Sequence, residues 1–296
     1  FIIRVPSFFK NLVQASLYSQ YPDIEIYEVE DYTKDVAYKD PNAKWGMWGV
    51  EFVLSKEDPY PIKTYVDYGL DKDPKEEFKI DPMTPIIEYL GSVGPGEQVW
   101  IQILIMQTKD RFPIMGKWFG KQDWRKDSEK LIDKLMNRDK AGEEGATFGA
   151  LLLSPGQREV VEAVERSVSK LGFDCCIRAV YLARDGKFNV VNQVGIMSAF
   201  KQFNSLHLNG FKPGLKTTYD FIWQDPFGNR IAKRKKEMFE AYVRRGAFYA
   251  PVLRKPFVLN TEELATIYHF PGEVAKTPSL AKIESKRGEP PTNLPI

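Results

Sequence analysis

The sequence predicts an α+β fold built from helix–strand units that pack as ferredoxin-like α/β sandwiches, with two sandwiches in tandem as an option. Three observations support this class. An amphipathic helix, a short glycine or proline break and a strand recur three times along the chain. A further strong strand, Trp45–Leu54, lies between the first two copies. The composition, 43% apolar and 28% charged, is typical of a chain that buries a core.

The first copy begins near Pro6, where apolar residues recur at helical spacing from Phe8 to Leu17. A proline then ends the helix, and the alternation of Ile24–Val29 predicts a strand. Residues Phe1–Val5 are also expected to form a strand.

The second copy begins at Asp81, an N-cap residue that is followed by a proline. Its apolar stripe runs from Met83 to Leu90, and a glycine ends it. The strand Val99–Met106 is apolar on nearly both faces, so we expect it in the middle of a covered sheet.

The third copy has the clearest local signals. Ser154 and Gln157 form a predicted capping box, with a proline at the first helical position. The strand Phe173–Ala183 follows, and it contains Cys175 and Cys176. Adjacent cysteines are poor disulfide partners, so we expect two buried, reduced thiols.

The rest of the chain holds further predicted helices and loops. These helices are Ser128–Met136, Val190–Phe203, the basic helix Asn229–Arg245, and a short helix that Asn260 caps. The residues from Asn209 to Gly214 are expected to be a loop.

The predicted elements divide the chain into four parts. Residues 1–110 form a first α+β domain, and residues 111–149 form a helical insertion or linker. Residues 150–272 form a second α+β domain with the basic helix. Residues 273–296, rich in proline, lysine and glutamate, form an extended linker. Both ends of the sequence look like cuts through a longer polypeptide, so we expect a further domain beyond the linker.

The chemical motifs of common enzymes are missing from this sequence. It contains no phosphate-binding P-loop and no dinucleotide-binding glycine motif. Neither of its two histidines, His207 and His269, has a cysteine or a second histidine at metal-ligand spacing, and no Gly-x-Ser-x-Gly motif accompanies them. We therefore predict a non-catalytic segment without a cofactor; an enzyme of unfamiliar type that uses His207 or His269 is a third hypothesis.

Charge points to one candidate binding feature. The net charge is only +2, so any attraction to nucleic acid or membrane must be local. The basic helix could contact nucleic-acid phosphates or anionic lipid headgroups, and a solvated helix face is the alternative. Its candidate contact residues are Arg230, Lys233, Arg234, Lys235, Lys236, Arg244 and Arg245.

A second possible platform is aromatic. Phe200, Phe203 and Phe211 could stack on single-stranded bases, but core packing is the favoured interpretation.

Several phrases of the sequence resemble one protein family. This family is the amino-terminal region of type IV secretion and conjugative DNA-transfer ATPases, whose motor has a HerA/FtsK-like P-loop core. The similar phrases follow the family's order along the chain: Tyr21–Tyr32, Gly94–Ile103, Ala199–Asn204, Phe257–Gly272, Lys276–Pro278 and Ser285–Pro295.

The resemblance implies a role rather than a catalytic site. It implies an accessory, protein-interaction region of a DNA or protein translocation ATPase, truncated before its P-loop. ATP and magnesium would belong to the missing motor domain, and the full-length protein would be a hexamer. Its partners would be neighbouring subunits of the secretion or conjugation motor, with DNA as a further candidate partner, and membrane association would come only through parts outside this chain. The expected location is the cytoplasm, at the inner face of the cell membrane. The alternative is a nucleic-acid-binding module that uses the basic helix 229–245.

Overall fold

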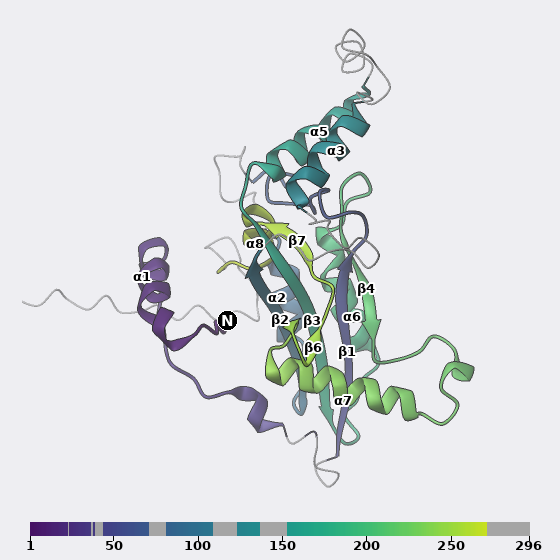
Figure 1. The fold of residues 1–296 in the computed structure, drawn as a ribbon. Coiled ribbons are helices and arrows are strands. Elements are labelled where there is room, and N and C mark those ends of the chain that lie inside the picture. The colour runs from purple at the N-terminus through teal and green to yellow at the C-terminus, as the bar shows by residue number, and fades with distance from the viewer. Residues whose placement is uncertain are drawn as a thin grey trace, which may run out of the picture.

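The centre of the fold is one antiparallel sheet of five strands in a computed structural model (Figure 1). The structure describes residues 1–22, 24–36, 38, 44–70, 81–108, 123–136 and 153–270. The strands of the sheet are β1 (Trp45–Leu54), β2 (Glu97–Gln107), β3 (Gly172–Arg184), β4 (Phe211–Lys216) and β7 (Phe257–Asn260). Their order is β2-β3-β1-β4, and β7 also pairs with β3.

The α+β class is confirmed, but the strands of the two predicted halves share one sheet. Strand β3, from the second half, lies between β2 and β1, both from the first half. One edge of β3 has two partners. It pairs with β1 from Ile177 to Arg184 and with β7 from Gly172 to Cys175. The sheet therefore does not divide into two tandem sandwiches at residue 110.

Alternate side chains of a strand point to opposite sides of the sheet, and in β3 helices cover both sides. One face packs against α2 (Thr84–Gly91) and α6 (Val191–Ala199), and the other against α7 (Asn229–Arg244) (Figure 1). Every residue of β3 from Asp174 to Ala183 is buried as a result.

The remaining helices lie around this sandwich. Helix α3 (Trp124–Leu135) packs against α5 (Pro155–Val168) at one end of the sheet. Helix α8 (Thr261–Ile267) follows β7, and α1 (Lys10–Gln20) lies apart from the sheet (Figure 1). Short 3-10 helices are η1 (Ser7–Phe9), η2 (Tyr32–Asp35), η6 (Lys201–Phe203) and η7 (Ile222–Gln224). A two-stranded ribbon joins β5 (Phe248–Tyr249) to β6 (Val252–Leu253).

Local signals in the sequence located several elements well. The capping box of Ser154 and Gln157 begins α5, and a second capping box of Asn260 and Glu263 begins α8. The helix expected at Ser128–Met136 is α3, which begins earlier because Asp123 is its N-cap. The predicted linker after residue 272 lies outside the described residues.

Four strand and loop predictions were wrong. Residues 1–5 and 24–29 are not strands, because neither segment has a sheet neighbour in the described structure. Strand β2 is at the edge of the sheet rather than in its middle, and Ile105 is 55% exposed. The expected loop around Pro213 is strand β4, where an edge position tolerates a proline.

A buried charge cluster ties the sheet to the chain beyond α7. The guanidinium of Arg178 is fully buried on β3, and its Nη2 lies 3.6 Å from Glu51 Oε1 on β1. Arg178 also donates to the carbonyl of Gly246, and Arg254 Nε donates to Glu51 Oε2 at 2.7 Å. Glu51 is therefore the shared counter-ion of two arginines.

We expect Cys175 and Cys176 to react slowly with thiol reagents in the native protein. Both are buried, on opposite faces of β3, and burial raises the pKa of each thiol and so suppresses the reactive thiolate. Labelling followed by mass spectrometry should accelerate strongly in denaturant. Rapid native labelling of both thiols would show that β3 is not covered on its two faces.

We expect Glu51→Gln to lower the free energy of unfolding by about 3 kcal/mol, because it leaves the buried charge of Arg178 without its partner. Urea unfolding of the full chain measures this change. The control is Glu237→Gln on α7, whose exposed pairing with Lys233 should matter by less than about 0.5 kcal/mol. Equal effects of the two substitutions would contradict the role given to Glu51.

Candidate interaction surface

Helix α7 is seated on β3 by one apolar stripe. Met238, Phe239 and Tyr242 are buried, and they pack with Val180 and Leu182 of β3. Gly49 of β1 lies under this stripe, and a Cβ at position 49 would be a tight contact, 3.0 Å from Met238 Cγ and 3.3 Å from the carbonyl oxygen of Ala179. The buried stripe fixes which basic residues of α7 face solvent.

The carboxyl end of α7 is held by a polar cluster. Arg245, with φ 52°, ends the helix in the left-handed region, and its Nη2 donates to Asp31 Oδ1 at 2.8 Å. The hydroxyls of Tyr32 and Tyr242 lie 2.9 Å apart beside this pair. The bond from Arg245 lowers the pKa of Asp31, so the carboxylate stays ionised. Arg245, predicted as a ligand contact, is therefore engaged within the fold.

Three other candidate cations of α7 are partly engaged near its amino end. Arg230 Nη1 donates to the carbonyl of Gln224 at 3.2 Å. The guanidinium of Arg234 lies 4.0 Å from the ring centroid of Tyr219. Lys235 is half-buried, and burial lowers the pKa of its ammonium group.

The remaining three candidates face solvent. Lys233, Lys236 and Arg244 are exposed. Lys233 has a loose pairing with Glu237 at 3.9 Å, and its side chain is 78% exposed. Of the seven predicted contacts, Arg234, Lys235 and Arg245 are therefore partly buried by the fold. The other four are exposed, although one of them, Arg230, also makes a hydrogen bond, and spacing along the sequence did not separate the two groups.

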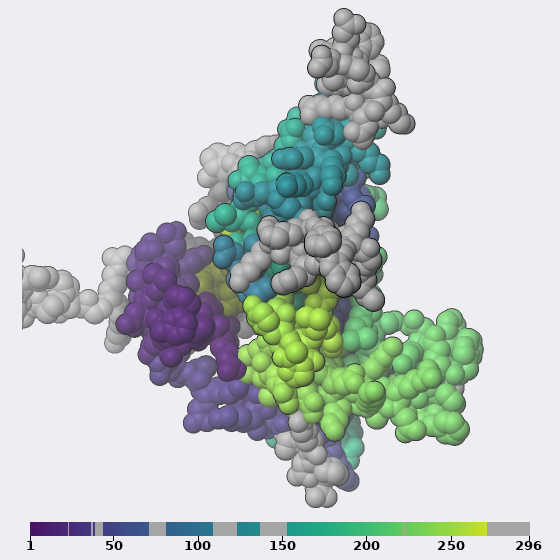
Figure 2. All heavy atoms as spheres, in the orientation of Figure 1, coloured from purple at the N-terminus to yellow at the C-terminus, as the bar shows by residue number. Residues whose placement is uncertain are grey.

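The structure adds a feature that the sequence reasoning missed. Residues 217–228, here called the aromatic loop, lead into α7 and protrude from the body of the molecule (Figure 2). Phe221 is 51%, Trp223 is 73% and Phe227 is 86% exposed. The rings of Phe221 and Trp223 stack with centroids 4.5 Å apart and planes 13° apart. The available signal was three aromatics within seven residues beside Asp and Pro-Phe-Gly turn residues.

The other candidate residues are used by the fold. Phe200, Phe203 and Phe211 are buried, which confirms core packing. His269 Nε2 lies 2.9 Å from Asp81 Oδ1, and its Nδ1 lies 2.8 Å from the carbonyl of Ala265. Burial is the largest single effect on His269 and lowers its pKa, but the hydrogen bond and charge of Asp81, together with backbone hydrogen bonds at Ala265 and Thr266, raise the pKa overall.

His207 and Glu263 also make contacts that belong to the fold. The carbonyl of His207 accepts from Lys56 Nζ at 2.7 Å, and the residue itself is exposed. Burial raises the pKa of Glu263 to about 8, a shift of the size seen at active sites. Both carboxyl oxygens of Glu263 accept backbone N–H groups, from Ile62 and Asn260, so it is a buried helix cap.

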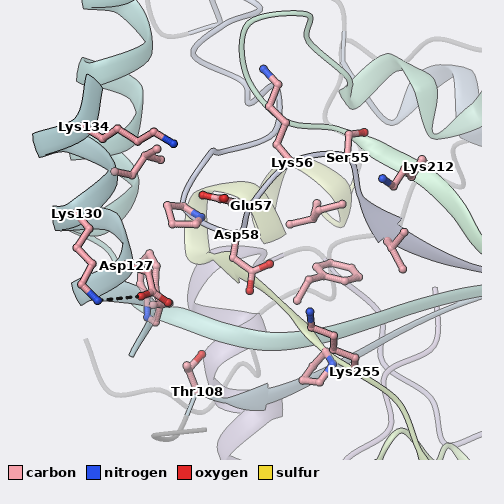
Figure 3. A pocket seen from close by; sticks show the side chains of 17 residues that line it. Ser55, Lys56, Glu57, Asp58, Thr108, Asp127, Lys130, Lys134, Lys212 and Lys255 are labelled. Atoms are coloured by element: carbon pink, nitrogen blue, oxygen red, sulfur yellow. Dashed lines mark ion pairs between the residues drawn. The ribbon is translucent and has the colours of Figure 1, made fainter. Parts of the chain in front are cut away.

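A pocket of about 830 Å³ opens between α3, the end of β1 and the start of β7 (Figure 3). Its charged lining is mixed: Lys56, Glu57, Asp58, Asp127, Lys130, Lys134, Lys212 and Lys255. Lys56 donates to the carbonyls of Leu206 and His207, and Lys130 lies 3.8 Å from Asp127. Because both acidic residues and lysines line the pocket, its charge favours neither an anionic nor a cationic ligand.

Comparison with known proteins places the chain in a family. Residues 9–283 match the model described as "Domain of unknown function (DUF8128)". The chain belongs to this family. No curated protein and no solved structure matches it.

Metal-binding groups and membrane-spanning helices are both absent from the described part of the chain. Over the described ranges, the DUF8128 chain has no group of three or more His, Cys, Asp or Glu side chains that could hold a metal ion. None of the helices in the same ranges is both long and apolar enough to cross a bilayer. The exposed cations of α7, the aromatic loop and the exposed apolar residues of η1 and α1 are features that packing among the described residues does not explain.

We expect Asp31→Asn to lower the free energy of unfolding by about 1–2 kcal/mol at pH 7, because it removes the charged partner of Arg245. The lowered pKa of Asp31 means that its contribution is present above its unfolded pKa of about 3.9 and is lost as the pH falls through its folded pKa. The difference between parent and variant should therefore narrow below about pH 4.

Urea unfolding from pH 3 to pH 7 measures this difference. Lys233→Gln is the matched control on the exposed side of α7, and it should change the free energy of unfolding by less than about 0.5 kcal/mol. A difference for Asp31→Asn that is constant with pH would exclude the ion pair as its cause.

Proposed function

We propose that this chain is a non-catalytic docking region of a conjugation-type translocation ATPase, and that it binds neighbouring subunits of the motor. The sequence resemblance supplies the class of machine. The observation that carries docking is helix α1, which forms without burying any of its own side chains. ATP and magnesium would act in a separate motor domain at the cytoplasmic face of the membrane.

Helix α1 and the 3-10 helix η1 that precedes it present an apolar surface to solvent. In η1, Phe8 is 77% and Phe9 is 45% exposed, and in α1 Leu12 is 62% exposed. The helix has 11 residues, and isolated helices shorter than about 12–15 residues are marginal in water. A helix of this kind gains its stability by burying an apolar face. A subunit that covers Phe8, Phe9 and Leu12 would supply that burial.

The chain on either side of α1 is attached to the main body. The ring of Phe1 packs edge-on against Tyr268 and Phe270, with centroids 5.5 and 5.2 Å apart. Tyr21 also packs against Phe270, at 5.1 Å. An anchored base with an exposed helix is the arrangement expected of a docking arm that reaches a neighbouring copy.

Nucleic-acid binding through α7 is the second candidate. The observation that favours it is the exposure of Lys233, Lys236 and Arg244 on one helix. Phosphate contacts by these residues would make binding strongly dependent on salt, so a titration at several salt concentrations separates this candidate from docking between subunits.

We expect the full chain to self-associate and Phe8→Ser/Leu12→Ser to weaken that association at least ten-fold. The two substitutions remove the apolar surface that a neighbour would bury, and they leave the core untouched. Sedimentation velocity between about 1 and 100 µM measures the association. Asn11→Ser is the matched control, because Asn11 is an exposed polar residue on the same helix.

The unfolding transition of the β-sheet core should be unchanged in both variants. A parent chain that stays monomeric over this whole range, or a double variant that associates like the parent, would contradict the role proposed for α1.

A further inference from the structure

We propose that the aromatic loop and the first turns of α7 bind the surface of an anionic lipid bilayer. Phe221, Trp223 and Phe227 would enter the interfacial layer, while Lys233 and Lys236 would contact lipid headgroups. This site is separate from α1 and does not depend on the proposed docking between subunits.

The aromatic side chains of the loop are placed for a partner outside the fold. Three large aromatic side chains are more than half exposed within seven residues, on a segment that protrudes from the body (Figure 2). Contiguous exposed apolar surface of this kind marks an interaction site on a soluble domain. Trp and Phe at such positions favour the boundary between lipid headgroups and acyl chains.

The loop is held in one position by its contacts with α7. Asp225 Oδ2 accepts the backbone N–H of Ile231 at 2.7 Å, and Arg230 donates to the carbonyl of Gln224. Arg234 covers the ring of Tyr219, and Phe221 stacks on Trp223. These contacts hold the backbone of the loop against the amino end of α7, so binding would order few additional backbone groups.

The charge around the loop is complementary to an anionic surface. Residues 216–236 contain six basic and two acidic residues. Both acids are already engaged: Asp220 pairs with Lys216 at 2.6 Å, and Asp225 accepts from Ile231. The exposed charge near the loop is therefore positive, although the whole chain carries only +2.

The separation of aromatics from cations favours a bilayer over single-stranded nucleic acid. Residues 217–229 contain no lysine or arginine, and the cations begin at Arg230. A nucleic-acid strand has one phosphate for each base, so its binding sites combine stacking aromatics with a basic groove that follows the backbone. A bilayer is layered, with charge at the surface and apolar material beneath it. The loop and α7 match this arrangement, because the aromatic residues of the loop are separate from the cations of the helix.

Vesicle sedimentation of the full chain tests the proposal. Vesicles of phosphatidylcholine with about one-third phosphatidylglycerol should bind the chain, and pure phosphatidylcholine vesicles should bind it much more weakly. Trp223→Ser/Phe227→Ser should lower partitioning onto the anionic vesicles at least about ten-fold. Lys233→Gln/Lys236→Gln should lower it by about five-fold per lysine at low salt.

Matched controls come from exposed residues elsewhere on the molecule. Leu206→Ser removes an apolar side chain that is 94% exposed, and Lys187→Gln/Lys201→Gln removes two exposed lysines. Both controls should bind like the parent. Phe8→Ser/Leu12→Ser should also bind like the parent, which distinguishes failure of this inference from failure of the docking role of α1.

Fluorescence supplies a second readout at the site. Emission of the parent should shift to shorter wavelength on anionic vesicles, and Trp223→Phe should bind but lose most of this shift. Equal binding to neutral and anionic vesicles, or loop variants that bind like the parent, would overturn the proposal. Binding to single-stranded DNA but not to vesicles, lost in the same loop variants, would also overturn it and would assign the surface to nucleic acid.

Discussion

The structure depends on strand β3 being covered on both faces. Its residues from Asp174 to Ala183 are buried, so the chain must supply helices on either side of the sheet. On one side this cover includes α7, whose buried residues Met238, Phe239 and Tyr242 pack against the sheet, with Met238 lying close to Gly49. The buried charge of Arg178 lies on the same face and requires Glu51. The position of α7 then determines where its exposed cations and the aromatic loop point.

The parts of the fold that could be predicted from the sequence depend on neighbouring residues. Capping boxes at Ser154 and Asn260 located two helix starts, because the hydrogen bonds that define them span three residues. Strand β1 and helix α7 were found within one residue, because their apolar periodicity is strong. The prediction that both cysteines are buried was also correct. Adjacent residues of a strand point to opposite faces, so burying both requires a strand that is covered on its two faces.

The parts that could not be predicted depend on partners far away in the sequence. The alternation of Ile24–Val29 resembles a strand, but no sheet edge among the described residues meets it. Strand β4 forms around Pro213 because β1 offers it an edge. Among the basic residues, Arg245 is engaged by Asp31, 214 positions away, while Lys233 faces solvent. The aromatic loop was missed because exposure of an aromatic residue is a property of the whole packing arrangement.

We propose that one surface, formed by the aromatic loop and the first turns of α7, binds an anionic bilayer, while packing against β3 holds α7 in place. Hydrogen–deuterium exchange of the full chain, with and without anionic vesicles, tests this most directly. The account predicts slower exchange confined to residues 219–236, with exchange of β3 unchanged. Unchanged exchange in residues 219–236, or slower exchange centred on α3 and the pocket beside it, would contradict the proposal.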